Sequence, residues 1–525
     1  MRVYDMIKRH VVALRSLSLC LLVLFTVSES HAATCESLQA LTLANTTITL
    51  TQSVAAGVFS SPTPGRGGVQ ADDVFKQLPA FCRVAATLRP SNNSDIKMEV
   101  WMPLANWNGK FQGVGNGGLA GFITFTAGSG GLERGMAEAL KRGYATASTD
   151  TGHTGDTAEP LLGHPEKLVD FSYRAVHEMT VVAKAIVRAF YDANPKLSYW
   201  NGCSTGGRQG LIEAQRFADD YDGIIAGAPP ISQTRLVTWS THVGQLVLRD
   251  PRNQIPSSKY SMIHQSVVNA CDAVDGTKDG LIDDPRRCRF DFKTIECNAG
   301  DSANCLTAAQ VQSAQAITSP VIHPKTREMI FPGLALGTEL GWGLRIGGTA
   351  PQRFGTDYFK YIFHEDPNWD WRTFELESAA AIADRVDFRM LNATDPDLRR
   401  FRQRNGKLLL YHGWSDANFS AQSTIDYYES VRAVVGSEQI GEWARLFLAP
   451  GMGHCGGGEG PNVFDPMAAL EQWVEQGRAP GSIIATHSTD GKIDRTRPLC
   501  PYPQVAKYNG TGSIDEAGSF TCRLP

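Results

Sequence analysis

Residues 202–207 read GCSTGG, and they stand between the strand-like segment LSYWN and a helix-like segment that starts near Gly206. A serine flanked by glycines at a strand-to-helix turn is typical of a nucleophile elbow, where the strained backbone leaves room only for small neighbours. The alternative is that Ser204 merely caps a helix and Cys203 pairs elsewhere. Because a G-x-S-x-G pattern also arises by chance, the serine needs partners elsewhere in the chain.

The segments around this turn repeat a strand–helix rhythm. Strand-like MEVWMPL, KFQGVGNGG, YATASTD, KLSYWNG and YDGIIAGAP alternate with helix-like stretches from about residue 98 to 229. Such alternation predicts an α/β fold with a mainly parallel, doubly wound sheet covered on both faces. The rhythm fails over 231–404 and resumes at GKLLLYHGW. We therefore predict a core formed by 33–230 and 405–525, with an inserted domain at 231–404.

The first 32 residues have the pattern of a cleavable secretory signal. Basic residues precede an apolar run at 17–27, and Ser30-His31-Ala32 follows, which predicts cleavage after Ala32. The run is too short to span a bilayer. The protein is therefore expected to be secreted or periplasmic. The formal net charge of −4 shows no basic excess, so neither nucleic acid nor a membrane is predicted as a partner.

The cysteines agree with an exported protein. Cys20 lies within the signal, and the ten that remain are an even number. Disulfides are therefore expected, with buried free thiols as the alternative. Proximity in the sequence suggests three local pairs: Cys271–Cys288, Cys297–Cys305 and Cys500–Cys522.

Two later segments offer partners for Ser204. A serine nucleophile needs a histidine to accept its proton and a carboxylate to orient that histidine. LLLYHGWSDANF offers Asp416 and LFLAPGMGHCGGG offers His454, each after a predicted strand. The order serine, aspartate, histidine is that of an α/β-hydrolase. His412 is a rival base, but it precedes the carboxylate and lies at the strand end.

Cys203 precedes the serine and Cys455 follows the histidine. If Ser204 and His454 are within hydrogen-bond reach, these cysteines come within the Cα separation of a disulfide. Their bond would tie the two loops together.

An oxyanion would also need backbone donors. The N–H of Thr205 is one candidate, and the glycine run GVGNGGLAG supplies the other, with Gly118 preferred to Gly117. Phosphate binding by this run is disfavoured, because the run lacks the Walker lysine and the complete dinucleotide pattern.

The segment CDAVDGTKDGLIDD in the insertion is an acidic, glycine-containing loop. Side chains of Asp272, Asp275 and Asp279, with the carbonyls of Thr277 and Leu281, would suit Ca²⁺. The loop is not an EF-hand, since it lacks the closing bidentate glutamate. A solvated acidic turn is the alternative. We expect the ion to stabilise the insertion rather than to take part in chemistry, and no organic cofactor is expected.

Together these motifs resemble the tannase and feruloyl esterase family, which includes mono(2-hydroxyethyl) terephthalate hydrolases. The resemblance covers nearly all of the mature chain and includes GCSTGG, SDANFS, GMGHCGGG and DAVDGTKDG. It implies an α/β-hydrolase core with an inserted lid that holds calcium, and Ser204, Asp416 and His454 as the catalytic triad. It also implies a Cys203–Cys455 bridge and a Cys35–Cys82 pair.

The resemblance implies a serine carboxylesterase acting on small aromatic esters. Thr205 after the nucleophile favours feruloyl- or galloyl-type esters, since terephthalate-monoester hydrolysis was first associated with glutamate there. That hydrolysis is the alternative activity, and a non-catalytic calcium-dependent carbohydrate-binding protein is the second. Arg345 and Arg353 lie in the lid but receive no role, and no oligomeric state is indicated.

Overall fold

The computed structural model describes residues 33–62, 71–126, 135–387, 390–436 and 439–525, and the predicted signal peptide lies outside them. Residues Ala33–Pro525 form one compact unit. In the described part of the chain, every helix is too short or too polar to cross a bilayer.

A nine-stranded sheet forms the centre of this unit, in the order β1-β2-β3-β5-β4-β6-β7-β10-β11. Strands β5, β4, β6, β7, β10 and β11 are parallel to one another. Strands β1, β2 and β3 pair antiparallel with their neighbours. This is the α/β-hydrolase arrangement, with β1 as an added edge strand, and it confirms the predicted fold class. The strands are β1 Thr46–Val54, β2 Phe81–Leu88, β3 Ile96–Pro103, β4 Lys110–Val114, β5 Ala145–Thr149, β6 Leu197–Cys203, β7 Gly223–Gly227, β10 Lys407–Gly413 and β11 Ala444–Ala449.

The longest core helix, α4, packs on the sheet because it presents an apolar stripe. In α4, the buried residues Val176, Met179, Ala183, Ile186 and Phe190 recur at intervals of three and four. Strand β10, which lies between β7 and the edge strand β11, is buried from Leu408 to Gly413, as expected for a strand covered on both faces. The core helices are α1 Ala71–Phe75, α2 Met136–Lys141, α3 Pro165–Val169, α4 Ala175–Tyr191, α5 Thr205–Arg216, α13 Ala421–Val435 and α14 Pro466–Gln476.

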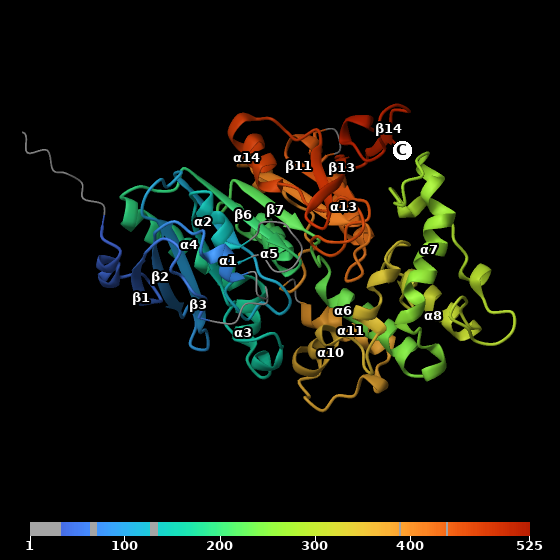
Figure 1. Ribbon diagram of the computed structural model, residues 1–525. Coiled ribbons are helices and arrows are strands. Elements are labelled where there is room, and N and C mark those ends of the chain that lie inside the picture. Colours follow the sequence, from blue (N-terminus) through green and yellow to red (C-terminus); the bar gives the residue numbers. More distant parts are fainter. Residues whose placement is uncertain (1–32, 63–70, 127–134, 388–389, 437–438) are drawn as a thin grey trace, which may run out of the picture. The chain divides into compact units, whose positions relative to one another are not determined.

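The described residues between β7 and β10 contribute no strand to the main sheet. They form helices that gather beside it (Figure 1), together with the short pair β8–β9. The large buried side chains of Trp239, Trp342 and Phe331 belong to a hydrophobic cluster of this region. We refer to it as the lid, and its boundaries at 231 and 404 stay a prediction. Its elements are α6 Gln233–Leu248, α7 Tyr260–Cys271, α8 Ala308–Thr318, β8 Val321–Ile322, β9 Met329–Phe331, α9 Gly343–Ile346, α10 Arg353–Asp357, α11 Leu376–Asp387 and α12 Arg399–Gln403.

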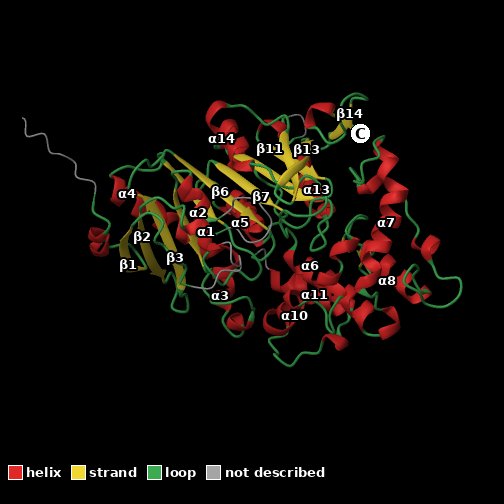
Figure 2. Cartoon of the chain, in the orientation of Figure 1, coloured by secondary structure: helices red, strands yellow, loops and turns green. Residues whose placement is uncertain are grey.

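Two further antiparallel pairs follow α14, and the sequence rhythm did not predict them. Figure 2 shows strand β13 beside β11 and strand β14 near the C-terminus. The first pair, β12–β13, forms because β-branched and alternating residues lie on both sides of a turn at Asp490-Gly491. The strands are β12 Ile483–Thr489, β13 Lys492–Leu499, β14 Val505–Tyr508 and β15 Phe520–Arg523.

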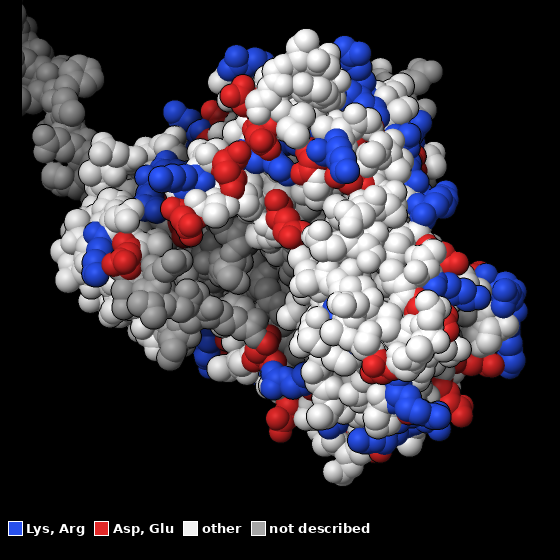
Figure 3. All heavy atoms as spheres, turned by 45° about the vertical axis from the view of Figure 1, so that its right-hand side comes forward, with Lys and Arg blue, Asp and Glu red and all other residues white. Residues whose placement is uncertain are grey.

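Five disulfides stabilise the unit. The three local pairs suggested by sequence proximity are present, as is the Cys35–Cys82 bond between the N-terminal segment and β2. The fifth bond joins Cys203 to Cys455. On the face shown in Figure 3, Lys and Arg side chains are interspersed with Asp and Glu.

Candidate active site

Ser204 occupies the sharp turn between β6 and α5. Its φ of 60° and ψ of −128° are a strained combination that L residues rarely adopt, as expected for a nucleophile elbow. A Cβ atom on Gly202 would lie 2.4 Å from the carbonyl oxygen of Gly206, so only glycine fits there. The glycines of GCSTGG therefore allow the backbone to make this tight turn. The turn places Ser204 at the carboxyl edge of the sheet.

Asp416 and His454 follow the adjacent parallel strands β10 and β11. Nδ1 of His454 lies 2.7 Å from Oδ2 of Asp416. Because Nδ1 faces the carboxylate, Nε2 is on the opposite side of the ring. Burial disfavours the charged carboxylate, but the hydrogen bonds and charge interactions with His454 and His412 outweigh it and hold the pKa of Asp416 below its ordinary value.

The bond between Cys203 and Cys455 places the nucleophile loop against the histidine loop. Their Cα atoms are 6.0 Å apart, across a sequence separation of 252 residues. Since Ser204 follows one cysteine and His454 precedes the other, the two loops are held side by side. The three sequence-predicted triad residues thus converge on one end of the sheet.

Two backbone N–H groups are available beside Ser204. In the described part of the chain, neither Thr205 N–H nor Gly118 N–H donates to another protein group. Gly118 has a φ of +59°, which favours glycine, and the Ala120 N–H donates to the carbonyl of Gly117. This bond fixes the peptide that carries the Gly118 N–H.

The glycine loop is fastened to helix α5. Gly206 N–H donates to the carbonyl of Asn116 at 2.7 Å, and Thr205 Oγ1 donates to the carbonyl of Gly118 at 2.6 Å. The side chains of Asn116 and Gln209 add two more hydrogen bonds. The nucleophile and both candidate oxyanion donors are therefore parts of one rigid assembly.

Two residues near Asp416 were not predicted from the sequence to support the triad. His412, the rival base, is fully buried, and its Nε2 lies 3.1 Å from Oδ2 of Asp416. Arg345 of the lid is also buried and bonds to the carbonyls of Ala417 and Asn418, next to Asp416. The position of His412 four residues before Asp416 was a signal in the sequence, but nothing local indicated the contacts of Arg345.

The lid contacts the histidine loop directly at one point and, at another, through Phe419 of the loop that carries Asp416. Phe419, packed in the lid cluster, lies edge-on to the His454 ring at 4.7 Å between centroids. His264 of α7 pairs with Glu339 of the lid and with Glu459, five residues after His454. Burial disfavours the charged form of His264, but hydrogen bonds to both glutamates raise its pKa to about 9.

The acidic loop of the lid collects oxygen donors and negative charge. Asp272 and Asp275 each accept backbone N–H bonds through Oδ1 alone, so the second oxygen of each makes no hydrogen bond with described residues. Burial and neighbouring carboxylates raise the pKa of Asp275 to about 6. The same causes raise the pKa of Asp283, which the sequence analysis did not name, to about 7. The donor set and charge fit an oxygen-preferring cation such as Ca²⁺.

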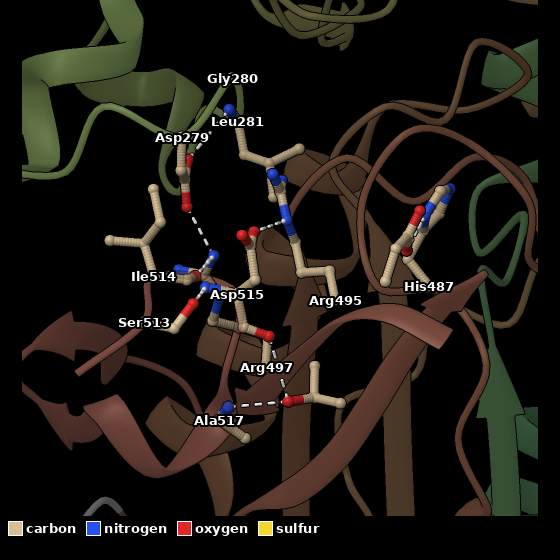
Figure 4. Close-up of polar contacts among 12 residues, drawn as sticks. Asp279, Gly280, Leu281, His487, Arg495, Arg497, Ser513, Ile514, Asp515 and Ala517 are labelled. Carbon is tan, nitrogen blue, oxygen red and sulfur yellow. Dashed lines mark hydrogen bonds and ion pairs between the residues drawn. The ribbon is translucent and has the colours of Figure 1, made fainter. Parts of the chain in front are cut away.

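The third predicted side chain of this loop, Asp279, already has partners. Its Oδ1 accepts from the Leu281 N–H, and its Oδ2 forms a buried ion pair with Arg497 of β13 (Figure 4). The carboxylates of Asp272, Asp275 and Asp279 do not all lie within 4.8 Å of one another. The acidic loop therefore suits Ca²⁺ in its donor type and charge, but its carboxylates are not arranged as a complete coordination sphere.

Another group of potential metal ligands lies beside the core. His177, Glu213 and Asp220 place ligand atoms within 4.8 Å of one another. Lys184 donates to the Asp220 carbonyl. Burial and the neighbouring Asp220 raise the pKa of Glu213 well above its ordinary value, and the charge of Lys184 opposes this only in part. Because an ammonium group already supplies positive charge there, we assign no metal to this group.

Comparisons with known proteins agree with this geometry. The family model described as tannase and feruloyl esterase matches residues 82–523. An uncharacterized esterase of Xanthomonas campestris pv. campestris is 36% identical, with 97% of this chain and 94% of that protein covered. A probable feruloyl esterase B-2 of Aspergillus terreus is 34% identical, with 84% and 86% covered. The crystal structure of feruloyl esterase B from Aspergillus oryzae has a TM-score of 0.86 and 31% identity, with 93% and 99% covered.

Proposed function

The chain belongs to the tannase and feruloyl esterase family, whose members are carboxylesterases, and we propose that it cleaves feruloyl- or galloyl-type aromatic esters through an acyl-enzyme on Ser204. One observation carries the assignment of residues. The Cys203–Cys455 bond fastens the serine loop to the loop of a histidine whose Nδ1 lies 2.7 Å from Asp416.

In the first half-reaction, Ser204 Oγ attacks the ester carbonyl while Nε2 of His454 accepts its proton. The carbonyl oxygen becomes an oxyanion, which accepts hydrogen bonds from the N–H groups of Thr205 and Gly118. Asp416 stays ionised and stabilises the imidazolium. As the tetrahedral intermediate collapses, the C–O bond to the alcohol breaks, and His454 protonates the departing alcohol.

In the second half-reaction, a water molecule loses a proton to His454 and attacks the acyl-enzyme. The same N–H groups bind the new oxyanion. The bond to Ser204 then breaks, His454 returns its proton to Oγ, and the aromatic acid leaves. The lid would supply the apolar walls that exclude bulk water and select the acyl group.

The acidic loop suits a structural calcium ion. Asp272 and Asp275 would hold it with a free carboxylate oxygen each, and the carbonyls of Thr277 and Leu281 belong to the proposed ligand set. Asp279 would join the set through the lone pairs left by its bonds to the Leu281 N–H and Arg497. When bound, the ion supplies positive charge that offsets the buried carboxylates of the lid. Five disulfides and the predicted signal sequence also support export.

Parallel assays on methyl ferulate, methyl gallate and mono(2-hydroxyethyl) terephthalate test this function. We expect turnover of one or both phenolic esters, and loss of at least about 10⁴-fold in kcat for Ser204→Ala. Ser482→Ala, an exposed serine after α14, is the matched control and should retain activity. A preference for the terephthalate ester would shift the substrate assignment. Wild-type protein inert on all three esters would favour the non-catalytic binding alternative.

A further inference from the structure

The carboxylate of Asp416 accepts four hydrogen bonds. Oδ1 accepts from the N–H groups of Asn418 and Phe419 at 2.7 and 3.1 Å. Oδ2 accepts from Nδ1 of His454 at 2.7 Å and faces Nε2 of His412 at 3.1 Å. A carboxylate has about four lone-pair sites, so this one is fully occupied. One oxygen is therefore shared between two imidazoles.

The contacts of His412 fix which of its nitrogens carries the proton. An ionised carboxylate only accepts hydrogen bonds, so Nε2 must be the donor. The other nitrogen, Nδ1, lies 2.8 Å from Thr424 Oγ1, and it then accepts a bond from that hydroxyl. His412 and Thr424 are both fully buried. The Thr424 hydroxyl, the His412 imidazole and the Asp416 carboxylate are thus linked by buried hydrogen bonds. The last of these ends on the oxygen that also accepts from His454.

We propose that His412 is a positioning residue for the triad, which holds Asp416 in line with His454 and limits the negative charge on their shared oxygen. The inference rests on the proposed function. His412 is fully buried and contacts the triad at Oδ2 of Asp416, so it is expected to act through that carboxylate. Without it, the carboxylate would keep a single side-chain donor and would turn more freely about its last torsion.

Because two imidazoles share Oδ2, the proposal predicts the direction in which the pH profile of activity moves when His412 is replaced. Loss of the His412 donor leaves more negative charge on the oxygen that faces His454, which stabilises the imidazolium. The catalytic imidazole would then be protonated at higher pH, and a protonated base cannot accept the serine proton. The acid limb of the kcat/KM profile is therefore expected to move upward.

Other charged groups near Asp416 remain in place when His412 is replaced. Arg345 of the lid has a favourable charge interaction with Asp416, although burial lowers the pKa of its guanidinium to about 10. His454 and the backbone N–H groups of residues 418 and 419 complete the surroundings. Since Arg345 stays charged through neutral pH, it does not produce the shift in the acid limb.

Two substitutions at one position separate hydrogen bonding from packing. The amide of His412→Gln can reach the position of Nε2, whereas that of His412→Asn reaches only the position of Nδ1. We expect His412→Asn to lower kcat on the best ester by about tenfold to a hundredfold and to move the acid limb upward, with KM changed by less than about twofold. His412→Gln should recover kcat to within about threefold of the wild type.

Thr424→Val tests the same series of hydrogen bonds at the end farthest from His454. It replaces His412→Asn as the test if that variant fails to fold. It removes the hydroxyl that fixes the His412 tautomer, so a smaller loss of kcat with the same direction of pH shift is expected. His487→Asn is the control, because His487 pairs with Asp494 at 2.7 Å on the β12–β13 hairpin, outside the hydrogen bonds around Asp416. Its kcat and pH profile should match the wild type.

The proposal is overturned if folded His412→Asn keeps both the wild-type kcat and the wild-type acid limb. It is also overturned if the Asn and Gln variants lose kcat equally, because the role would then be one of volume alone. These results differ from failure of the proposed function, in which Ser204→Ala itself would keep its activity.

Discussion

Thr205 Oγ1 donates a 2.6 Å hydrogen bond to the carbonyl of Gly118, 87 residues earlier in the chain. The neighbouring Leu119 N–H donates to Asp156 at 3.0 Å, so the peptide after Gly118 is fixed at both its oxygen and its nitrogen. The side chain that follows the nucleophile thus orients the loop that carries the second proposed oxyanion donor.

Thr205→Val keeps the shape of this side chain and removes its hydroxyl. We expect kcat to fall by about tenfold with little change in KM, because the oxyanion donor would be misplaced while ester binding persists. Thr205→Ser should restore most of the rate. Steady-state kinetics on methyl ferulate check the prediction, and equal losses in the two variants would refute it.

Removal of the Cys203–Cys455 bond should affect both stability and rate. We expect the double variant Cys203→Ser/Cys455→Ser to lose about 2–4 kcal/mol of stability. Its kcat should fall by about tenfold or more, since the loops of Ser204 and His454 would no longer be held together. Cys500→Ser/Cys522→Ser is the matched control. It should lower Tm yet leave kcat within about twofold of the wild type, and a similar loss of kcat in both variants would contradict the role of the bond.

The contacts of His264 with Glu339 and Glu459 predict a pH-dependent stability. The pKa of His264 is raised from its ordinary 6.5 to about 9 in the folded protein. A raised pKa gives stabilisation that is fully present below the ordinary value and is lost as pH rises through about 9. Tm of the wild type should therefore decline between about pH 7 and 10 more steeply than Tm of His264→Gln. Parallel slopes for the two proteins would count against this contribution.

Calcium should stabilise the lid. Treatment with EGTA is expected to lower Tm, and added Ca²⁺ should restore it, because an ion that binds only the folded state stabilises that state. Asp272→Asn should abolish the response to calcium. Asp291→Asn, an exposed acid that accepts from the Lys293 N–H in the same region, should preserve it. Calorimetry that shows no effect of EGTA on the wild type would exclude a structural calcium ion.

The elbow and the strand–helix rhythm were predictable because both are local. GCSTGG shows small residues at a turn, and the segments from β3 to β7 keep their period over short windows. The antiparallel strands β1 and β2 and the pairs β12–β13 and β14–β15 were not predicted, since nothing in the α/β rhythm requires them. The order of the strands in the sheet was not predicted either.

Contacts between segments far apart in the sequence were harder to predict. The pairing of Cys203 with Cys455 could be argued because each cysteine adjoins a proposed catalytic residue. By contrast, no pattern places Glu459 beside His264, or Arg345 beside the carbonyl of Asn418. Such contacts depend on how the lid sits on the core, which the local sequence does not record. His412 was visible as a histidine, but only its distance to Asp416 distinguished a supporting partner from a competing base.

The buried ion pair between Asp279 and Arg497 has a consequence for protein engineering. It fastens the acidic loop of the lid to a strand that comes more than 200 residues later. A transplanted lid without an acid at the position of Asp279 would therefore leave the guanidinium of Arg497 buried and unpaired unless the final strands are exchanged with it. The natural unit of exchange in this scaffold is the lid together with its C-terminal hairpins, although they are not contiguous in the gene.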